Sequence, residues 1–181
     1  MYEELKRMQK RKILTTLIAV LFSLLLTSCQ IDMTFSNSEV DMVTPIEELE
    51  RTDIFLPGAV AHILEGEINA KGEAVGFHYD KLDTKKGEIM TGTETDPDEF
   101  GVYEAKVIVE NVEKTSNSGY STFFPDDWDS QEVIDAINDA YAHLEHIHGN
   151  TYEGLTKDGM LIRMYLTEDE RIISAFPLYD R

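Results

Sequence analysis

The chain has 181 residues, of which 35 are acidic and 16 are basic, and its formal net charge is −19 at pH 7. This length suits one domain with a single hydrophobic core, plus short additional segments. The acidity argues against broad electrostatic capture of nucleic acid, because such binding depends on Lys and Arg side chains that neutralise phosphates. A site that acts on a phosphate would need a local cluster of positive donors.

The N-terminal segment has the pattern of a secretion signal. Five basic residues lie between positions 6 and 12, and a mostly apolar run follows from Ile13 to Leu26. This run is too short for an ordinary membrane-spanning helix, which needs about 20 apolar residues. A basic flank, an apolar run and small residues before a break are typical of a signal peptide. An uncleaved N-terminal anchor helix is the alternative.

The only cysteine, Cys29, ends the sequence Leu-Thr-Ser-Cys, which resembles a lipobox, the lipidation and cleavage site of bacterial lipoproteins. A lone thiol in an exported chain lacks a disulfide partner, whereas a thiol converted to a thioether needs none. We therefore predict a signal peptide over residues 1–28 and a lipid on Cys29. The protein would be anchored on the extracytoplasmic face of a membrane, or released or exported from there. Removal of residues 1–28 takes away five basic and two acidic side chains and lowers the net charge from −19 to −22.

Residues 29–57 are polar and acidic, with few large apolar side chains. Such a composition buries too little surface to offset chain entropy, so we expect a flexible tether. Residues 45–49 and 54–56 could add a helical turn or a docking segment. Residues 58–181 then form one domain of ordinary size.

The first half of this domain is expected to start with a short helix and to continue with strands. Apolar residues at 59–64 suit a short helix that carries His62, and residues 70–79 and 86–93 are expected to be strands. Apolar and charged side chains alternate over residues 102–110, which is the pattern of a half-buried strand.

The second half combines one longer helix with further strands. A turn at 117–119 leads to an aromatic strand at 120–124. A capping-box pattern at Asp129 and Glu132, followed by apolar residues at helical spacing, predicts an amphipathic helix over 130–146. Two or three more strands are expected, at 154–157, 160–166 and 172–177. Strands and helices do not alternate regularly, so the predicted fold class is α+β, mainly antiparallel sheets with a short N-terminal helix and one longer amphipathic helix.

Two histidines stand in short motifs that contain glycine. His62 opens the sequence His-Ile-Leu-Glu-Gly-Glu, and His78 follows Gly-Phe. An imidazole titrates near neutral pH, so two of them can hold a proton donor and a proton acceptor on opposite sides of a reacting phosphate. That pair can cleave RNA without a metal. The alternative is two unrelated surface or half-buried histidines.

Further motifs follow in the same order along the chain. They are Gly-Val-Tyr-Glu-Ala-Lys-Val at 101–107, Tyr-Ser-Thr-Phe-Phe-Pro-Asp-Asp-Trp at 120–128 and Ser-Ala-Phe-Pro-Leu-Tyr at 174–179. With the histidine motifs, this series resembles the bacterial EndoU family, the uridylate-preferring endoribonucleases that also occur as effector domains of bacterial toxins. The resemblance implies an EndoU-like fold and cleavage of RNA at uridines without a cofactor. Tyr79 stands where many members have another histidine, which leaves room for an altered substrate or a decayed enzyme.

The resemblance also implies catalytic roles. Cleavage by internal attack needs a base for the 2′ proton, an acid for the departing 5′ oxygen and a cation near the phosphate oxygens. His62 and His78 match the base and the acid. Lys114 matches the cation, and Lys106 is its rival.

Residues near the C-terminus match the family's substrate contacts. Ser174 stands where the family has a hydroxyl that contacts uracil, and Phe176 or Tyr179 could stack on the base. Thr122 could supply a second hydroxyl. Stacking is blind to sequence, so discrimination has to come from hydrogen bonds. The alternative for these residues is ordinary core or strand packing.

A second histidine cluster lies at the predicted end of the long helix, at His143, His146 and His148. Histidines three apart share a helical face and could bind zinc. No cysteine or carboxylate set completes such a site, and cationic histidines near a helix C-terminus already gain from the helix dipole. We therefore predict no metal site.

The sequence thus predicts a lipid-anchored, metal-independent endoribonuclease. Its partners would be RNA, the membrane through its lipid, and an immunity protein if the chain is a toxin. The alternative is a non-catalytic surface lipoprotein that keeps this fold and binds a ligand or partner.

Overall fold

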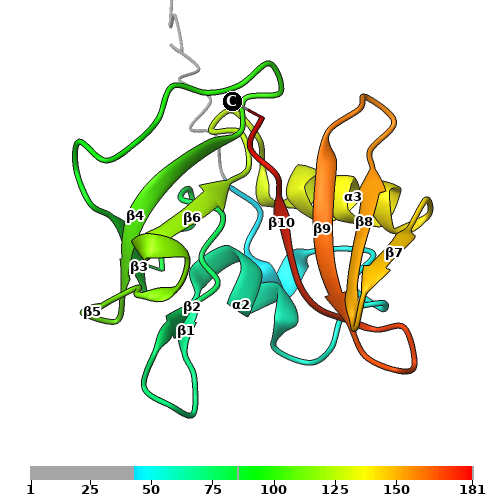
Figure 1. Cartoon of the computed structure of the whole chain (residues 1–181), viewed down its shortest axis with the longest axis horizontal. Helices are drawn as coiled ribbons and strands as arrows, with labels where there is room; N and C mark the ends of the chain where they lie inside the picture. The colour runs from blue at the N-terminus through cyan, green and yellow to red at the C-terminus, as the bar shows by residue number, and fades with distance from the viewer. Residues whose placement is uncertain (1–42, 85, 181) are drawn as a thin grey trace, which may run out of the picture. The chain divides into compact units, whose positions relative to one another are not determined.

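The computed structural model describes residues 43–84 and 86–180, which belong to one folded unit (Figure 1). The predicted signal peptide, Cys29 and the first half of the predicted tether, residues 29–42, lie outside the described residues. In the part of the chain that is described, no helix combines the length and apolar character needed to cross a membrane.

Two antiparallel sheets form most of the fold (Figure 1). The first has the order β10-β9-β8-β7, with the strands Ile172–Pro177, Leu161–Leu166, Thr151–Leu155 and Glu145–His148. The second is built around β4 (Tyr103–Val109), whose partners are β3 (Gly87–Ile89), β5 (Val112–Glu113) and β6 (Tyr120–Phe123). A small hairpin pairs β1 (Glu67–Ile68) with β2 (Ala74–Val75). The predicted α+β class with antiparallel sheets is confirmed.

The helices are α2 (Ala59–Glu65) and α3 (Ser130–Tyr141), with two short 3-10 turns at η1 (Ile46–Glu48) and η2 (Ser116–Gly119). α3 begins at the predicted capping box, in which the Asp129 carboxylate accepts from backbone N–H groups and Glu132 accepts from the Asp129 N–H. This arrangement satisfies donors that the first helical turn leaves open.

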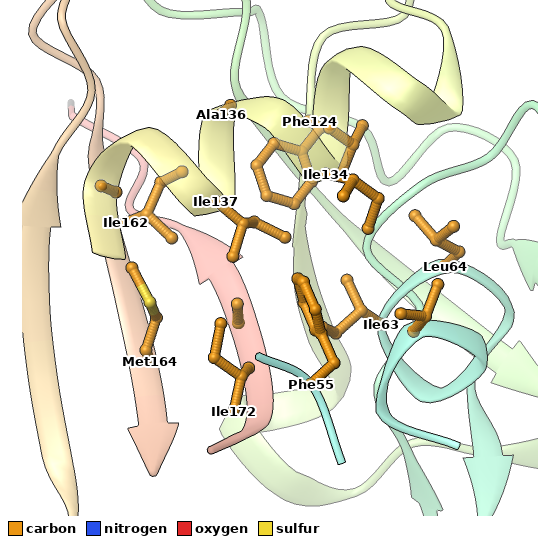
Figure 2. Packing of buried hydrophobic residues seen from close by; sticks show 14 of the residues in the cluster. Phe55, Ile63, Leu64, Phe124, Ile134, Ala136, Ile137, Ile162, Met164 and Ile172 are labelled. Atoms are coloured by element: carbon orange, nitrogen blue, oxygen red, sulfur yellow. The ribbon is translucent and has the colours of Figure 1, made fainter. Parts of the chain in front are cut away.

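The main core lies between α2, α3 and the first sheet (Figure 2). The apolar stripe of α3 includes Ile134 and Ile137, which are fully buried in the same cluster as Ile162 of β9 and Ile172 of β10. A second cluster lies under β4, where alternate residues are buried as the sequence pattern predicts. The two cores fix the sheets on which the candidate site is built.

Some predicted element bounds are wrong. The long helix ends at Tyr141 instead of residue 146, because residues 145–148 pair with β8 as strand β7. The predicted strand at 70–79 is reduced to β2, because the backbone turns at Gly76 and Phe77, which have φ values of +74° and +62°. The predicted strand at 86–93 is reduced to β3.

The segment 43–57, assigned above to the tether, packs against the domain. Leu49 and Phe55 are buried in the main core, and Phe55 forms a parallel bridge with Ile172. Thr44 donates two hydrogen bonds to the carboxylate of Asp129. The folded unit therefore begins upstream of residue 58. The polar composition of the whole segment concealed its few well-spaced apolar side chains.

Candidate active site

The seven residues that the sequence assigns to catalysis or substrate binding line one cleft of about 800 Å³. They are His62, His78, Lys114, Thr122, Ser174, Phe176 and Tyr179. One wall comes from β6 and η2 and the other from β9, β10 and the turn between β7 and β8, so the cleft joins the two sheets. The Lys106 side chain, the rival cation, is not among the lining residues and lies with Nζ 5.6 Å from the ring centroid of Tyr120.

Backbone hydrogen bonds hold the two histidine segments together. The N–H of Phe77 donates to the carbonyl of His62 at 3.2 Å, and the N–H of His78 donates to the carbonyl of Ile63 at 2.8 Å. A Cβ at Gly76 would lie 2.0 Å from the His62 carbonyl oxygen. The glycine of the Gly-Phe-His motif is therefore required by this close approach and by its left-handed backbone.

The surroundings of His78 favour its neutral form and leave one ring nitrogen without a partner among the described residues. Its Nδ1 lies 2.7 Å from the carbonyl oxygen of Thr122, so Nδ1 carries the proton and Nε2 keeps its lone pair. Burial of the ring lowers the pKa of His78 well below its usual 6.5, and the positive charge of Lys114 lowers it further. This state is the one that a general base requires.

His62 has a different environment. Its Nδ1 lies 3.1 Å from Oε1 of Glu67, and its Nε2 lies 3.1 Å from Oγ of Ser174. Burial lowers the pKa of His62, while the hydrogen bond and the charge of Glu67 act to raise it. The pKa of His78 is lowered further, so His62 is the more easily protonated of the two imidazoles.

Lys114 places its charge in the cleft. Its Nζ donates to Oγ of Ser121 at 2.7 Å and to the carbonyl of Gly76 at 3.4 Å. Burial lowers the pKa of Lys114 to about 8. At pH 7 the ammonium group is therefore mostly charged, and it faces the same space as the two imidazoles.

The predicted substrate residues have distinct surroundings. Ser174 is bonded to His62, and the ring of Phe176 stacks on His78. The hydroxyl of Tyr179 donates to the carbonyl of Asp96 at 2.9 Å. The Thr122 hydroxyl oxygen is buried and has no partner among the described residues.

Sequence reasoning gave no role to Glu67, although it closes the motif that His62 opens. Its spacing of five residues from His62 spans the end of α2 and the start of β1, and this turn brings the carboxylate to the imidazole. Glu67 is part of the same sequence motif as His62, but a spacing of five residues does not by itself show that the two side chains make contact.

The second histidine cluster is not on one helical face, because His143 follows α3 and His146 and His148 belong to β7. Nδ1 of His143 bonds the Asp139 carbonyl, and Nε2 of His146 bonds the Gly149 carbonyl. Within residues 43–84 and 86–180, no three His, Cys, Asp or Glu side chains are grouped so as to hold a metal ion.

Comparisons with known proteins identify the family of the chain. The family model described as bacterial EndoU nuclease matches residues 58–179. A curated protein of Bacillus cereus named "Toxin" is 44% identical over 142 residues, which cover 78% of this chain and 25% of that protein. The chain thus spans about a quarter of the length of that relative. No solved structure matches the present chain. With two thirds of its length matched by the family model, the chain belongs to the bacterial EndoU nuclease family.

Proposed function

We propose that the domain is a metal-independent endoribonuclease that cleaves RNA at uridines. The observation that supports this most strongly is the opposite state of two imidazoles in one cleft. His78 offers a free Nε2 acceptor, whereas His62 has a carboxylate partner that favours its protonated form. A base and an acid of this kind are what internal attack by a ribose hydroxyl needs.

In the proposed reaction, Nε2 of His78 removes the proton from the 2′ hydroxyl of the uridine. The 2′ oxygen attacks the adjacent phosphorus while the bond from phosphorus to the 5′ oxygen breaks. His62 gives up its hydrogen bond to Ser174 and donates the proton on Nε2 to that departing oxygen, while Nδ1 stays bonded to Glu67. The products are a 2′,3′-cyclic phosphate and a free 5′ hydroxyl, and the enzyme is left with its proton on His78.

Lys114 stabilises the charge that builds up on the non-bridging phosphate oxygens. Its ammonium group is held by Ser121 and Gly76 before substrate arrives. Such preorganised donors contribute most where water is excluded. This local cation compensates for a chain whose overall charge of −19 repels RNA.

Uracil recognition is assigned to hydroxyl groups beside the catalytic pair. Ser174 contacts the base, since its hydroxyl lies next to His62. Thr122 lines the same cleft and supplies the second hydroxyl once its side chain, whose hydroxyl oxygen is buried without a partner among the described residues, turns toward the base. The ring of Tyr179, fixed by its bond to Asp96, offers a surface for the base. Stacking is worth roughly 1–3 kcal/mol for any base, so the hydroxyl groups provide the selectivity.

The cellular setting is also a proposal. Similarity to a protein named "Toxin" supports an effector role, in which the producing cell needs an immunity protein. The lipobox-like sequence at Cys29 supports a lipid anchor on the extracytoplasmic face. Wild-type protein should fractionate with membranes, and Cys29→Ser should remain unprocessed. Mature wild-type protein without a lipid on its N-terminus would exclude the anchor.

The catalytic proposal is tested by incubating the chain from residue 29 onward with uridine-containing RNA in the presence of a chelator. His62→Ala and His78→Ala should each lower the rate by roughly 10²–10⁴, and the double variant should be little worse than either, because the groups act as a unit. His146→Ala, outside the cleft, is the matched control and should cleave normally. Full activity of His78→Ala would refute the assignment, and an inactive wild type would favour the non-catalytic surface lipoprotein.

A further inference from the structure

We propose that the cleft holds a second nucleotide, next to the cleaved uridine, on the side formed by β9, β10 and the turn between β7 and β8. This second nucleotide site consists of Asn150, Arg163, Tyr165 and Ile173, all of which line the cleft. None of these residues has a role in the proposed chemistry. The inference rests on the proposed RNA cleavage and adds to it the part of the substrate that lies beyond the reacting uridine.

The cleft extends past the space that one base held at Ser174 would fill. Its volume of about 800 Å³ lies in the upper part of the range of roughly 300–1,000 Å³ for ligand pockets. Ser174 of β10 is opposite Tyr165 of β9, and a row of cleft residues continues from them to Asn150, which directly precedes β8. Neighbouring strands are about 4.8 Å apart, so this row extends roughly 10 Å from Ser174. A single pyrimidine held at Ser174 leaves the far end of the row uncovered.

The floor of the second nucleotide site suits a base. Tyr165 is half-buried, and its ring is tilted by 46° against Phe176, with the centroids 6.0 Å apart. Ile173 is 38% exposed, which makes it one of three large apolar side chains that are exposed in the described part of the chain. An aromatic ring beside an exposed aliphatic side chain offers a surface on which a base of any sequence can stack.

The rim of the site supplies polar groups. Asn150 is exposed in the turn between β7 and β8, and its carbonyl accepts from the N–H of Leu166 at 3.0 Å, which fixes the turn. Its carboxamide has no bonding partner among residues 43–84 and 86–180. This group has two donors and one acceptor for a base edge.

Arg163 adds a positive charge to the same wall. Its Nε and Nη2 donate to the Glu153 carboxylate, which holds the guanidinium in place. Nη1 has no partner among the described residues and can donate to a phosphate oxygen. Arg163 and Lys114 are the only Lys or Arg side chains among the residues that line the cleft. They therefore provide two separate positive charges that can bind phosphates of the RNA chain, which the net negative charge of the protein otherwise repels.

The experiment compares two substrates of the chain from residue 29 onward. Uridine 3′-(4-nitrophenyl phosphate) carries no second nucleotide, whereas the trinucleotide ApUpA does. The measured quantity is the ratio of kcat/KM for ApUpA to kcat/KM for the small substrate. Tyr165→Leu should lower this ratio about tenfold, because the stacking surface is lost. Asn150→Ala, at an exposed position that does not endanger folding, should lower it roughly two- to tenfold.

Two control variants accompany these changes. Tyr165→Phe keeps the ring and should keep the wild-type ratio. Glu145→Ala changes an exposed residue of the same β7–β8 hairpin that does not line the cleft, and it should leave both rates unchanged. An unchanged ratio in Tyr165→Leu and Asn150→Ala, or an equal loss on both substrates, would overturn the second nucleotide site. A wild type inactive on both substrates would instead overturn the proposed RNA cleavage.

Discussion

The imidazole of His78 stacks on the ring of Phe176, with 5.1 Å between the ring centroids and 17° between the planes. One face of the Phe176 ring is therefore covered by the proposed general base and is not free to receive uracil. Together with the hydrogen bond from Nδ1 to Thr122, this contact fixes both the position and the plane of the imidazole.

Phe176→Leu should consequently lower kcat more than it changes KM. A displacement of about 1 Å in a catalytic group can cost roughly 10²-fold in rate, so we expect a loss of between ten- and a hundredfold. Steady-state kinetics on uridine-containing RNA measures the split. Phe176→Tyr keeps the ring and should retain most activity. A raised KM with unchanged kcat would instead support the sequence-based role of Phe176 in stacking on the base.

The pH dependence of kcat/KM reports the ionisation of the free enzyme. The proposed base, His78, must be neutral and the proposed acid, His62, must be protonated. Burial lowers both pKa values below 6.5, and Lys114 lowers both further by its charge. The rate should therefore rise through the pKa of His78, fall through the higher pKa of His62, and have its optimum on the acidic side of pH 6.5.

A substitution of Glu67 tests whether the pKa of His62 is the higher of the two. Its carboxylate raises the pKa of His62, so Glu67→Gln should move the alkaline limb of the profile to lower pH and leave the acid limb in place. Glu73→Gln, in the same β1–β2 region and bonded to Asn69, is the control and should not move either limb. A shift of the acid limb alone in Glu67→Gln would exchange the roles of the two histidines.

The two candidate lysines should differ in effect. Lys114 lines the cleft, whereas Lys106 packs over the ring of Tyr120. A cation that stabilises charge formed only in the transition state affects kcat more than substrate binding. Lys114→Ala should lower kcat by roughly 10²–10³, the usual cost of removing one such donor. Lys106→Ala should have a kcat close to wild type, and the reverse order would reassign the catalytic cation.

The N-terminal boundary of the domain is testable by truncation. Leu49 and Phe55 are buried in the main core, and burial of each side chain is worth roughly 1.5–3 kcal/mol. A chain that begins at residue 58 should therefore melt at a clearly lower temperature than one that begins at residue 41. Equal melting temperatures in calorimetry would show that residues 43–57 add nothing to stability.

Capping and periodicity patterns in the sequence correctly predicted the elements whose structure depends on nearby residues. α3 begins at its capping box, and β4 buries every second side chain, as the sequence indicates. The end of α3 was not predictable in the same way, because β7 exists through its pairing with β8. The helical spacing of apolar residues gives no information about a distant strand that pairs with the same segment and so ends the helix.

The candidate site shows the same limit. The motifs predicted which side chains would meet in the cleft, but not how they contact one another. Ser174 is 112 residues from His62 in the sequence, and their contact follows from the packing of α2 against β10. The tautomer of His78, with the proton on Nδ1, likewise depends on a carbonyl of β6. Neither contact leaves a periodic or composition signal.

Gly76 provides a final test of how the backbone positions the site. Gly76 and Gly72 both have positive φ values, +74° and +78°, so a side chain at either position meets the same backbone strain. The Cβ at position 76 would lie 2.0 Å from the His62 carbonyl oxygen, whereas nothing lies within 4 Å of a Cβ at position 72. Gly72→Ala should therefore cost only about 1 kcal/mol of stability and remain active.

Gly76→Ala should be worse in both respects. The added methyl group must push α2 away from the segment that carries His78, and this separates the proposed acid from the proposed base. We expect at least a further 2 kcal/mol of destabilisation, within the usual 1–3 kcal/mol for overpacking, and loss of most RNA cleavage below the melting temperature. Chemical denaturation and a cleavage assay on the same preparations measure the two effects. Equal stability and activity of the two variants would show that the close approach of Gly76 to His62 does not position the catalytic pair.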